Sequence, residues 1–281
     1  MNSGSDVPDF ARPSTVDEAS RLLAAGGWRV LAGGTDLYPG AGSGLAGPVL
    51  DVTALPGFST IDMGKGLRIG AAVSWSSIAE ARLPPALRAL QQAARQIGGR
   101  QVQNAGTIGG NLCNASPAAD GVPPLLALDA EVELMSDAGP RRLALQDFLL
   151  GPRRTALREG EVLAAVHVPE AALVGQSGFV KLGARSHLVI SIAMAAVRLV
   201  VTGDIIVRAA VAVGACSPVA QRLPAVEAAL IGAGVGEAVE RVRAGDVQAA
   251  LSPIDDVRAT AAYRREAAVE LVRRAVAEAV A

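Results

Sequence analysis

The stretch LAGGTDLYPG, residues 31–40, places two adjacent glycines, a threonine and an aspartate directly after a short apolar run. A second stretch of similar chemistry, GTIGGNLCNASPAAD, occupies residues 106–120. Glycine allows backbone conformations that other residues resist, so a glycine-rich loop can turn several N–H groups toward one anion. Two such loops in one chain indicate two parts of a single anion-binding site.

Polar side chains accompany both glycine pairs. Thr35, Thr107 and Asn111 supply neutral hydrogen-bond donors. Asp36 and Asp120 supply acceptors, suited to sugar hydroxyls or to capping backbone N–H groups. The pattern predicts a pyrophosphate held between the two loops, with a carboxylate available for a ribose. The alternative interpretation is that both loops are only tight turns.

Length and charge narrow the class of protein. A chain of 281 residues is long enough for a large core and two domains. The net charge is −1 and no basic block appears, so nucleic acid is not an expected partner. The start MNSGSDVPDF lacks the features of a signal peptide, and the apolar run 188–201 contains Arg198 and is too short to span a bilayer. We therefore expect a cytoplasmic protein without membrane insertion.

Cysteine and histidine are too few for most metal or disulfide chemistry. Cys113 and Cys216 cannot build a disulfide framework, a four-thiolate zinc site or an iron–sulfur cluster, and His167 and His187 are the only imidazoles. Any redox carrier is therefore expected to be organic and bound from solution. Cys113 lies inside the second glycine-rich stretch. We favour a small buried residue there over a reactive thiol, which would need a lowered pKa.

Hydrophobic periodicity and capping residues predict the elements of the first two thirds of the chain. Thr15 and Glu18 fit a capping box for a helix within residues 12–27, and Ser74 starts a short helix. A longer helix is predicted at 84–98 and a hairpin turn at 136–143. The predicted strands cover residues 28–32, 44–55, 67–74, 131–136 and 162–169.

A linker is predicted at residues 169–178, and the pattern changes after it. Antiparallel strands are predicted at 179–183, 188–201 and 205–216, followed by helices near 222–231, 235–243 and 257–280. A small sheet covered by helices on one side would fit this region.

One further glycine pattern does not support a site. GSGLAG, residues 42–47, has the spacing of the dinucleotide fingerprint, but Pro48 and strand-like sequence follow it where a helix should begin. We interpret it as a flexible connector.

Three segments together resemble one known family. They are LAGGTDLYPG (31–40), GTIGGNLCNASPAADGVPPLLALDA (106–130) and KLGARSHLVISIAMAAV (181–197). Their order and spacing resemble the FAD-binding, or medium, subunit of the molybdenum-containing hydroxylases, the xanthine dehydrogenase and carbon monoxide dehydrogenase group. DDVRATAAYRREAAVELVRRAV (255–276) is similar to the closing helix of that family.

The resemblance implies an α+β fold. An FAD-binding domain of the two-subdomain vanillyl-alcohol-oxidase (PCMH) type would cover residues 1–170, with subdomains of about 1–55 and 56–170. A small C-terminal flavoprotein domain, an antiparallel sheet with helices, would cover 171–281.

The resemblance also implies a set of cofactor-binding residues. The backbone from Leu31 to Asp36 would hold the FAD pyrophosphate, and Thr107, Gly110 and Asn111 would complete that grip. Adenosine and its phosphates would lie near Asn114 and Asp120, the adenine side near Leu163, and the flavin or ribityl chain near Lys181. The full set is Leu31, Ala32, Gly33, Gly34, Thr35, Asp36, Leu37, Thr107, Gly110, Asn111, Cys113, Asn114, Asp120, Leu163 and Lys181. No residue of this chain is expected to be catalytic or to bind metal. Many relatives carry Arg before the Asn that precedes GTIGG, where this chain has Gln103 and Asn104.

The implied function is electron transfer in a heterotrimer. A large partner subunit would hold the molybdenum cofactor and a small one would hold [2Fe–2S] clusters. Electrons would reach non-covalent FAD on this chain and then an external acceptor such as NAD, a quinone or oxygen. The alternatives are a stand-alone FAD-dependent reductase of the cell-wall-precursor type and a flavin-free scaffold subunit.

Overall fold

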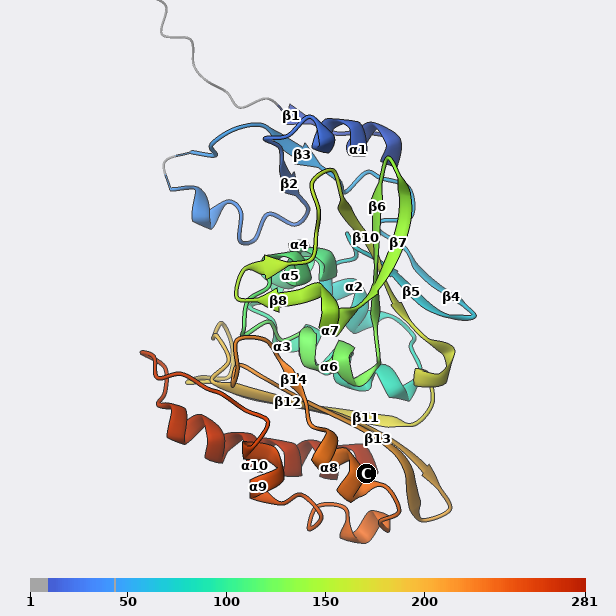
Figure 1. The fold of residues 1–281 in the computed structure, drawn as a ribbon, viewed down its shortest axis with the longest axis vertical. Helices are drawn as coiled ribbons and strands as arrows, with labels where there is room; N and C mark the ends of the chain where they lie inside the picture. The colour runs from blue at the N-terminus through green and yellow to red at the C-terminus, as the bar shows by residue number, and fades with distance from the viewer. Residues whose placement is uncertain (1–9, 43) are drawn as a thin grey trace, which may run out of the picture.

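Three layers are stacked along the long axis of the molecule (Figure 1). The computed structural model describes residues 10–42 and 44–281. Residues 1–9, which lack the features of a signal peptide, and Ser43 within GSGLAG lie outside the described residues. The predicted α+β class is confirmed, because helices and four separate sheets share the chain.

The first layer is a small parallel sheet with one helix. The strand order is β1-β3-β2, with bounds β1 (Phe10–Ala11), β2 (Arg29–Leu31) and β3 (Val49–Asp51), and the helix is α1 (Val16–Ala24). The Oγ1 of Thr15 accepts a hydrogen bond from the Glu18 N–H at 3.2 Å, as the capping box predicts. The reciprocal half differs, because the Glu18 carboxylate accepts from the N–H of Ser14 at 3.0 Å.

The second layer contains a five-stranded antiparallel sheet in the order β4-β5-β10-β6-β7. Its strands are β4 (Ile61–Gly64), β5 (Gly66–Gly70), β6 (Glu131–Ser136), β7 (Gly139–Ala144) and β10 (Val162–Val168). The predicted hairpin joins β6 to β7. β4 has no counterpart among the predicted strands, because at this edge position its side chains are largely exposed and give no apolar run.

Short helices fill the space between this sheet and the third layer (Figure 1). They are α2 (Trp75–Glu80), η2 (Pro85–Leu87), α3 (Arg88–Gln96), α4 (Arg100–Ala105), α5 (Ile108–Asn114) and α6 (Val122–Ala127). The second glycine-rich stretch is therefore not a loop throughout, since its centre is α5. Thr107 caps that helix, and Ile108 and Leu112 are buried, which outweighs the low helix propensity of two glycines.

A two-stranded hairpin and short turns complete this half. The hairpin is β8 (Leu149–Gly151) with β9 (Arg154–Thr155), preceded by α7 (Leu145–Phe148). Two turns of 3₁₀ helix lie elsewhere, η1 (Pro39–Ala41) and η3 (Glu170–Ala172). The predicted linker 169–178 thus contains η3 and the first residues of the next strand.

The third layer is a four-stranded antiparallel sheet in the order β11-β12-β13-β14. The strands are β11 (Gln176–Leu182), β12 (Ala193–Thr202), β13 (Ile205–Gly214) and β14 (Gln221–Arg222). The helices that follow are α8 (Pro224–Leu230), η4 (Val235–Glu237), α9 (Ala244–Gln248) and α10 (Ala261–Val280).

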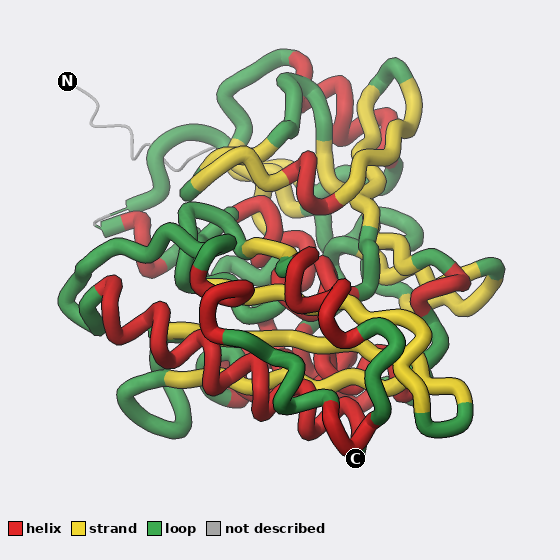
Figure 2. The backbone as a smooth tube through the Cα atoms, turned by 60° about the horizontal axis from the view of Figure 1, so that its bottom comes forward, coloured by secondary structure: helices red, strands yellow, loops and turns green. Residues whose placement is uncertain are grey.

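The helices of the C-terminal region cover one face of this sheet, as predicted, and helices of the preceding layer cover the other face. Figure 2 shows α10, the long C-terminal helix, lying along the sheet, and it packs on β11 and β12. The opposite face contacts α3 and α6 of the preceding layer. Phe179, Met194 and Ala196 are buried between sheet and helices there. The two halves of the chain therefore share one continuous packed interface.

Within residues 10–42 and 44–281, no helix combines the length and apolar character needed to cross a membrane.

Candidate functional site

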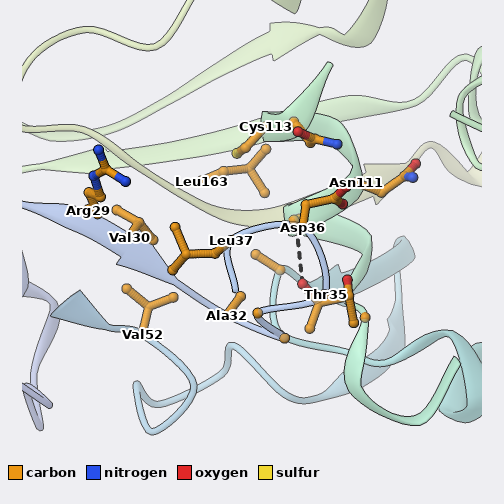
Figure 3. A pocket seen from close by; sticks show the side chains of 18 of the residues that line it. Arg29, Val30, Ala32, Thr35, Asp36, Leu37, Val52, Asn111, Cys113 and Leu163 are labelled. Carbon is orange, nitrogen blue, oxygen red and sulfur yellow. Dashed lines mark hydrogen bonds between the residues drawn. The ribbon is translucent and has the colours of Figure 1, made fainter. Parts of the chain in front are cut away.

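A cavity of about 530 Å³ lies where the two glycine-rich stretches meet (Figure 3). Its walls come from the segment after β2, from α5 and its approach, and from the start of β10. The lining residues are Arg29, Val30, Ala32, Gly33, Gly34, Thr35, Asp36, Leu37, Gly40, Val52, Ala71, Trp75, Ile97, Val102, Gly106, Thr107, Gly109, Gly110, Asn111, Cys113, Asn114, Leu157, Glu161, Val162 and Leu163.

Close backbone contact explains the first glycine pair. A Cβ atom on Gly33 would lie 1.9 Å from the carbonyl oxygen of Ala105, so only glycine lets the 31–37 segment rest against the end of α4. Gly34 has φ +70°, and a Cβ there would lie 2.5 Å from the ring of Tyr38. These glycines therefore fix the segment in place beside the second stretch.

The first stretch offers unpaired donors to the cavity. Within the described residues, the backbone N–H groups from Gly33 to Leu37 make no hydrogen bond. The second stretch differs, because Ile108 and Gly109 donate to the carbonyls of Val73 and Ala71 at 3.0 and 2.9 Å. Successive free N–H groups suit an anion, and the 33–37 segment offers more of them than the second stretch does.

Gly110 and Asn111 give independent signs of a ligand on the opposite wall. A Cβ atom on Gly110 would meet only the Oγ1 of Thr107, at 3.0 Å, so packing within the protein does not account for this glycine as it does for Gly33. The Oδ1 of Asn111 is buried and has no hydrogen-bond partner in the described part of the chain. A buried acceptor without a donor costs about 1–3 kcal/mol, which a ligand donor would offset.

Both polar and apolar groups line the cavity. In Figure 3, Thr35, Asp36 and Asn111 gather on one side, and Val30, Val52 and the charged Arg29 lie on the other. The buried indole of Trp75, together with Ile97, Val102 and Leu163, adds apolar surface to the lining. A large ligand with both a ring system and a charged polar region fits such a lining.

Two titratable groups on the wall have displaced pKa values. The guanidinium of Arg141 donates to both oxygens of Glu161 at 2.6 and 2.8 Å and holds the pKa of that carboxyl below its ordinary value, so Glu161 is a fixed anion. Desolvation raises the pKa of Cys113 to about 12. The thiol therefore stays protonated, as expected of an unreactive residue, but the side chain is exposed, so the prediction of a small buried residue at Cys113 was wrong.

Comparison with known proteins identifies the family of the chain. The family model described as the FAD binding domain in molybdopterin dehydrogenase matches residues 5–171, more than half of the chain. The chain belongs to this family of FAD-binding subunits. The CO dehydrogenase flavoprotein C-terminal domain matches residues 179–279.

Two relatives and one solved structure are similar to this chain over almost its whole length. The chain is 31% identical to the nicotine 6-hydroxylase medium subunit of Paenarthrobacter nicotinovorans, over 96% of each chain. It is 30% identical to the glyceraldehyde dehydrogenase medium chain of Sulfolobus acidocaldarius, over 96% of this chain and 98% of that one. A chain of the reconstituted CO dehydrogenase from Oligotropha carboxidovorans superposes with a TM-score of 0.88 at 29% identity, covering 100% and 99% of the two chains.

Most of the residues expected to bind the cofactor share this one cavity in the FAD-binding subunit. Those that line it are Ala32, Gly33, Gly34, Thr35, Asp36, Leu37, Thr107, Gly110, Asn111, Cys113, Asn114 and Leu163. Leu31, Asp120 and Lys181 do not line it. Sequence reasoning also missed several wall residues, including Trp75, Ile97, Val102 and Glu161. Only Trp75 carried a sequence signal, as one of two tryptophans in the chain.

The three residues outside the lining have other contacts. Leu31 is a buried residue of β2 whose carbonyl accepts from Val52. The Nζ of Lys181 donates to Asp120 at 2.6 Å and to the carbonyl of Gln96 at 3.2 Å. The hydroxyl of Ser191 donates to the other Asp120 oxygen. Burial raises the pKa of Asp120 even with these partners. This buried pair joins the helical layer to the C-terminal sheet.

Gln103, at the position where the family resemblance leads us to expect Arg, has a structural role. Its Nε2 donates to the carbonyls of Arg95 and Ile97 at 2.9 and 3.2 Å, and the side chain is buried. It therefore satisfies carbonyls at the end of α3 and fixes Ile97 at the cavity wall.

Proposed function

We propose that this chain holds one FAD non-covalently in the cavity between the 33–37 segment and α5. The observation that carries the proposal is the pairing of five unpaired N–H groups with an apolar wall in one cavity of about 530 Å³. The N–H groups from Gly33 to Leu37 would bind the pyrophosphate. Gly110 would leave room for it, and Asn111 would accept a hydrogen bond from the cofactor.

The remaining wall residues would orient the two ends of the cofactor. Leu163 would pack on the adenine side, and Asn114 would bind near the ribose and phosphates. Trp75 and Ile97 would contact ring surface and exclude water from it. Asp120 and Lys181 would act on this site through their buried pair, which holds the C-terminal sheet against the helices that form the wall.

We further propose the place of the chain in a heterotrimer. Its partners would be a large subunit with the molybdenum cofactor and a small subunit with [2Fe–2S] clusters. When bound, FAD would supply the redox chemistry that connects those clusters to an external acceptor such as NAD, a quinone or oxygen. The names of the relatives support this, since they are medium subunits of a hydroxylase and of a dehydrogenase.

The C-terminal match favours this function over the alternatives. A stand-alone reductase of the cell-wall-precursor type would not need a CO dehydrogenase flavoprotein C-terminal domain, which matches residues 179–279. A flavin-free scaffold would not need Gly110, because packing within the protein does not account for this glycine. We place the domain boundary at residue 170, with the FAD-binding domain before it and the C-terminal flavoprotein domain at 171–281.

Affinity purification of the tagged chain from its own cells tests the assembly. The proposal predicts that two further polypeptides, flavin, iron and molybdenum purify with it in fixed ratio. Purification of the chain alone, with flavin and without either metal, would refute the heterotrimer while leaving the FAD site in place.

A further inference from the structure

The turn of the β8–β9 hairpin lies against the end of α5. Arg153, in that turn, has φ +58°, an uncommon backbone conformation for a residue with a Cβ. In this conformation its N–H donates to the carbonyl of Ala115 at 2.9 Å. Ala115 itself is the left-handed C-cap of α5, with φ 44°. The hairpin therefore closes a helix that would otherwise end with free carbonyls.

The side chain of Arg153 continues past this contact to a residue of the cavity wall. Its Nη1 donates to the backbone carbonyl of Asn114 at 3.2 Å and also to the side-chain Oδ1 of Asn114. Asn114 lines the cavity, whereas Arg153 does not. A cation also interacts favourably with the carbonyl end of a helix. The two contacts hold both the main chain and the amide of Asn114.

The contact decides which group of Asn114 is available to a ligand. A carboxamide has one oxygen acceptor and one NH₂ donor on opposite sides of a planar group. With the oxygen bound by Arg153, the NH₂ group remains as the free polar group. A donor suits the phosphate and ribose oxygens of a dinucleotide, and an acceptor would repel the phosphates.

We propose that Arg153 is a positioning residue for the FAD site, which acts by fixing the Asn114 amide with its NH₂ group toward the cofactor. This inference rests on the proposed function, because it assumes that FAD occupies the cavity. Without Arg153 the amide could rotate, and part of the population would present its oxygen to the phosphates. The predicted consequence is weaker cofactor binding without a change in the fold.

The chain offers a matched control in the next residue. Arg154 lies on the same hairpin, is exposed, and has no side-chain hydrogen bond or ion pair within the described residues. Arg153→Ala keeps the N–H that binds Ala115 and introduces no new backbone strain, since both residues carry a Cβ. Arg153→Lys keeps a cationic donor and serves as the conservative variant.

The test is a double-mutant cycle on FAD affinity. The flavin is removed from the full-length chain, and its dissociation constant is measured by fluorescence titration for wild type, Arg153→Ala, Asn114→Ala and the double variant. We expect each single change to raise Kd about tenfold, as for one lost hydrogen bond, and the double variant to be no weaker than the single ones. Arg153→Lys should recover most of the affinity, and Arg154→Ala should match wild type. Melting temperatures of the FAD-free chains should agree.

Two results would overturn the inference. An unchanged Kd in Arg153→Ala would mean that the amide needs no support. An equal loss in the Asn114→Ala background would mean that Arg153 acts on the ligand directly. A wild-type chain that binds no FAD would instead refute the proposed function, and the inference with it.

Discussion

The substitution Gly110→Val should weaken FAD binding while leaving the stability of the fold almost unchanged. Gly110 does not have a positive φ, so a side chain causes no backbone strain there. A Cβ would meet only the Oγ1 of Thr107, 3.0 Å away, and must displace it by a few tenths of an ångström. Glycine costs about 1 kcal/mol relative to alanine in a helix, and valine costs less. The opposing effects should keep the free energy of unfolding within about 1 kcal/mol of wild type.

The effect on the cofactor should be much larger. The added methyl groups would extend into the cavity and move the pyrophosphate away from the N–H groups of Gly33 to Leu37. Loss of two hydrogen bonds to a charged group costs about 3–6 kcal/mol, which corresponds to at least a hundredfold rise in the Kd for FAD. The variant should therefore purify folded and without flavin.

The assay combines FAD titration with urea unfolding, and it uses Gly245→Val as the matched control. Gly245 also lies in a helix, α9, has an ordinary φ and has no atom within 4 Å of a Cβ position, but it does not line the cavity, so its replacement should leave FAD affinity unchanged. Full FAD occupancy in Gly110→Val would show that the pyrophosphate lies elsewhere.

Three further predictions address other contacts. Gly33→Ala should lower the free energy of unfolding by about 1–3 kcal/mol in urea, because its Cβ would overlap the carbonyl of Ala105; unchanged stability would contradict the close approach. Cys113 should resist alkylation at about pH 8, at which thiols with ordinary pKa values react; labelling as fast as in the unfolded chain would contradict its raised pKa. Desolvation opposes ionisation of Asp256, but backbone N–H groups and the guanidinium of Arg264 hold its pKa at about 2, below the ordinary 3.8. The folded pKa is the lower one, so this stabilisation is present above about pH 4 and is lost toward pH 2. Asp256→Asn should therefore destabilise the chain near neutral pH and scarcely at pH 2, as measured by denaturant unfolding at both values.

The sequence predicted elements where local signals and burial agree. Thr15 before an amphipathic run fixes α1, and Ser74 fixes α2, since each side chain caps its own helix. The alternating pattern of 131–136 and the turn after it fix the β6–β7 hairpin. These features depend on neighbours in the chain, so they can be recognised without knowledge of the fold.

Features that depend on distant contacts could not be predicted in this way. The helix at 108–114 has two glycines, and it forms because Val73 and Ala71 accept its first N–H groups. Trp75 and Ile97 reach the cavity only through the packing of α2 and α3. The partnership of Lys181 with Asp120 joins residues 61 positions apart.

The family resemblance pointed to Gly33, Gly34 and Gly110, which line the cavity on both of its walls. It did not explain why each of these positions is a glycine. The structure assigns Gly33 to contact between segments, Gly34 to a left-handed turn, and Gly110 to a position on the cavity wall where only the Oγ1 of Thr107 would meet a Cβ. A glycine that no protein contact requires is the best indication of where a ligand approaches.

The most direct test of the FAD site is the visible absorption spectrum of the purified chain, with the chromophore released by denaturation and identified. We expect flavin absorption and one FAD released per chain. A colourless chain that also fails to bind added FAD, alone or with its partner subunits present, would contradict it.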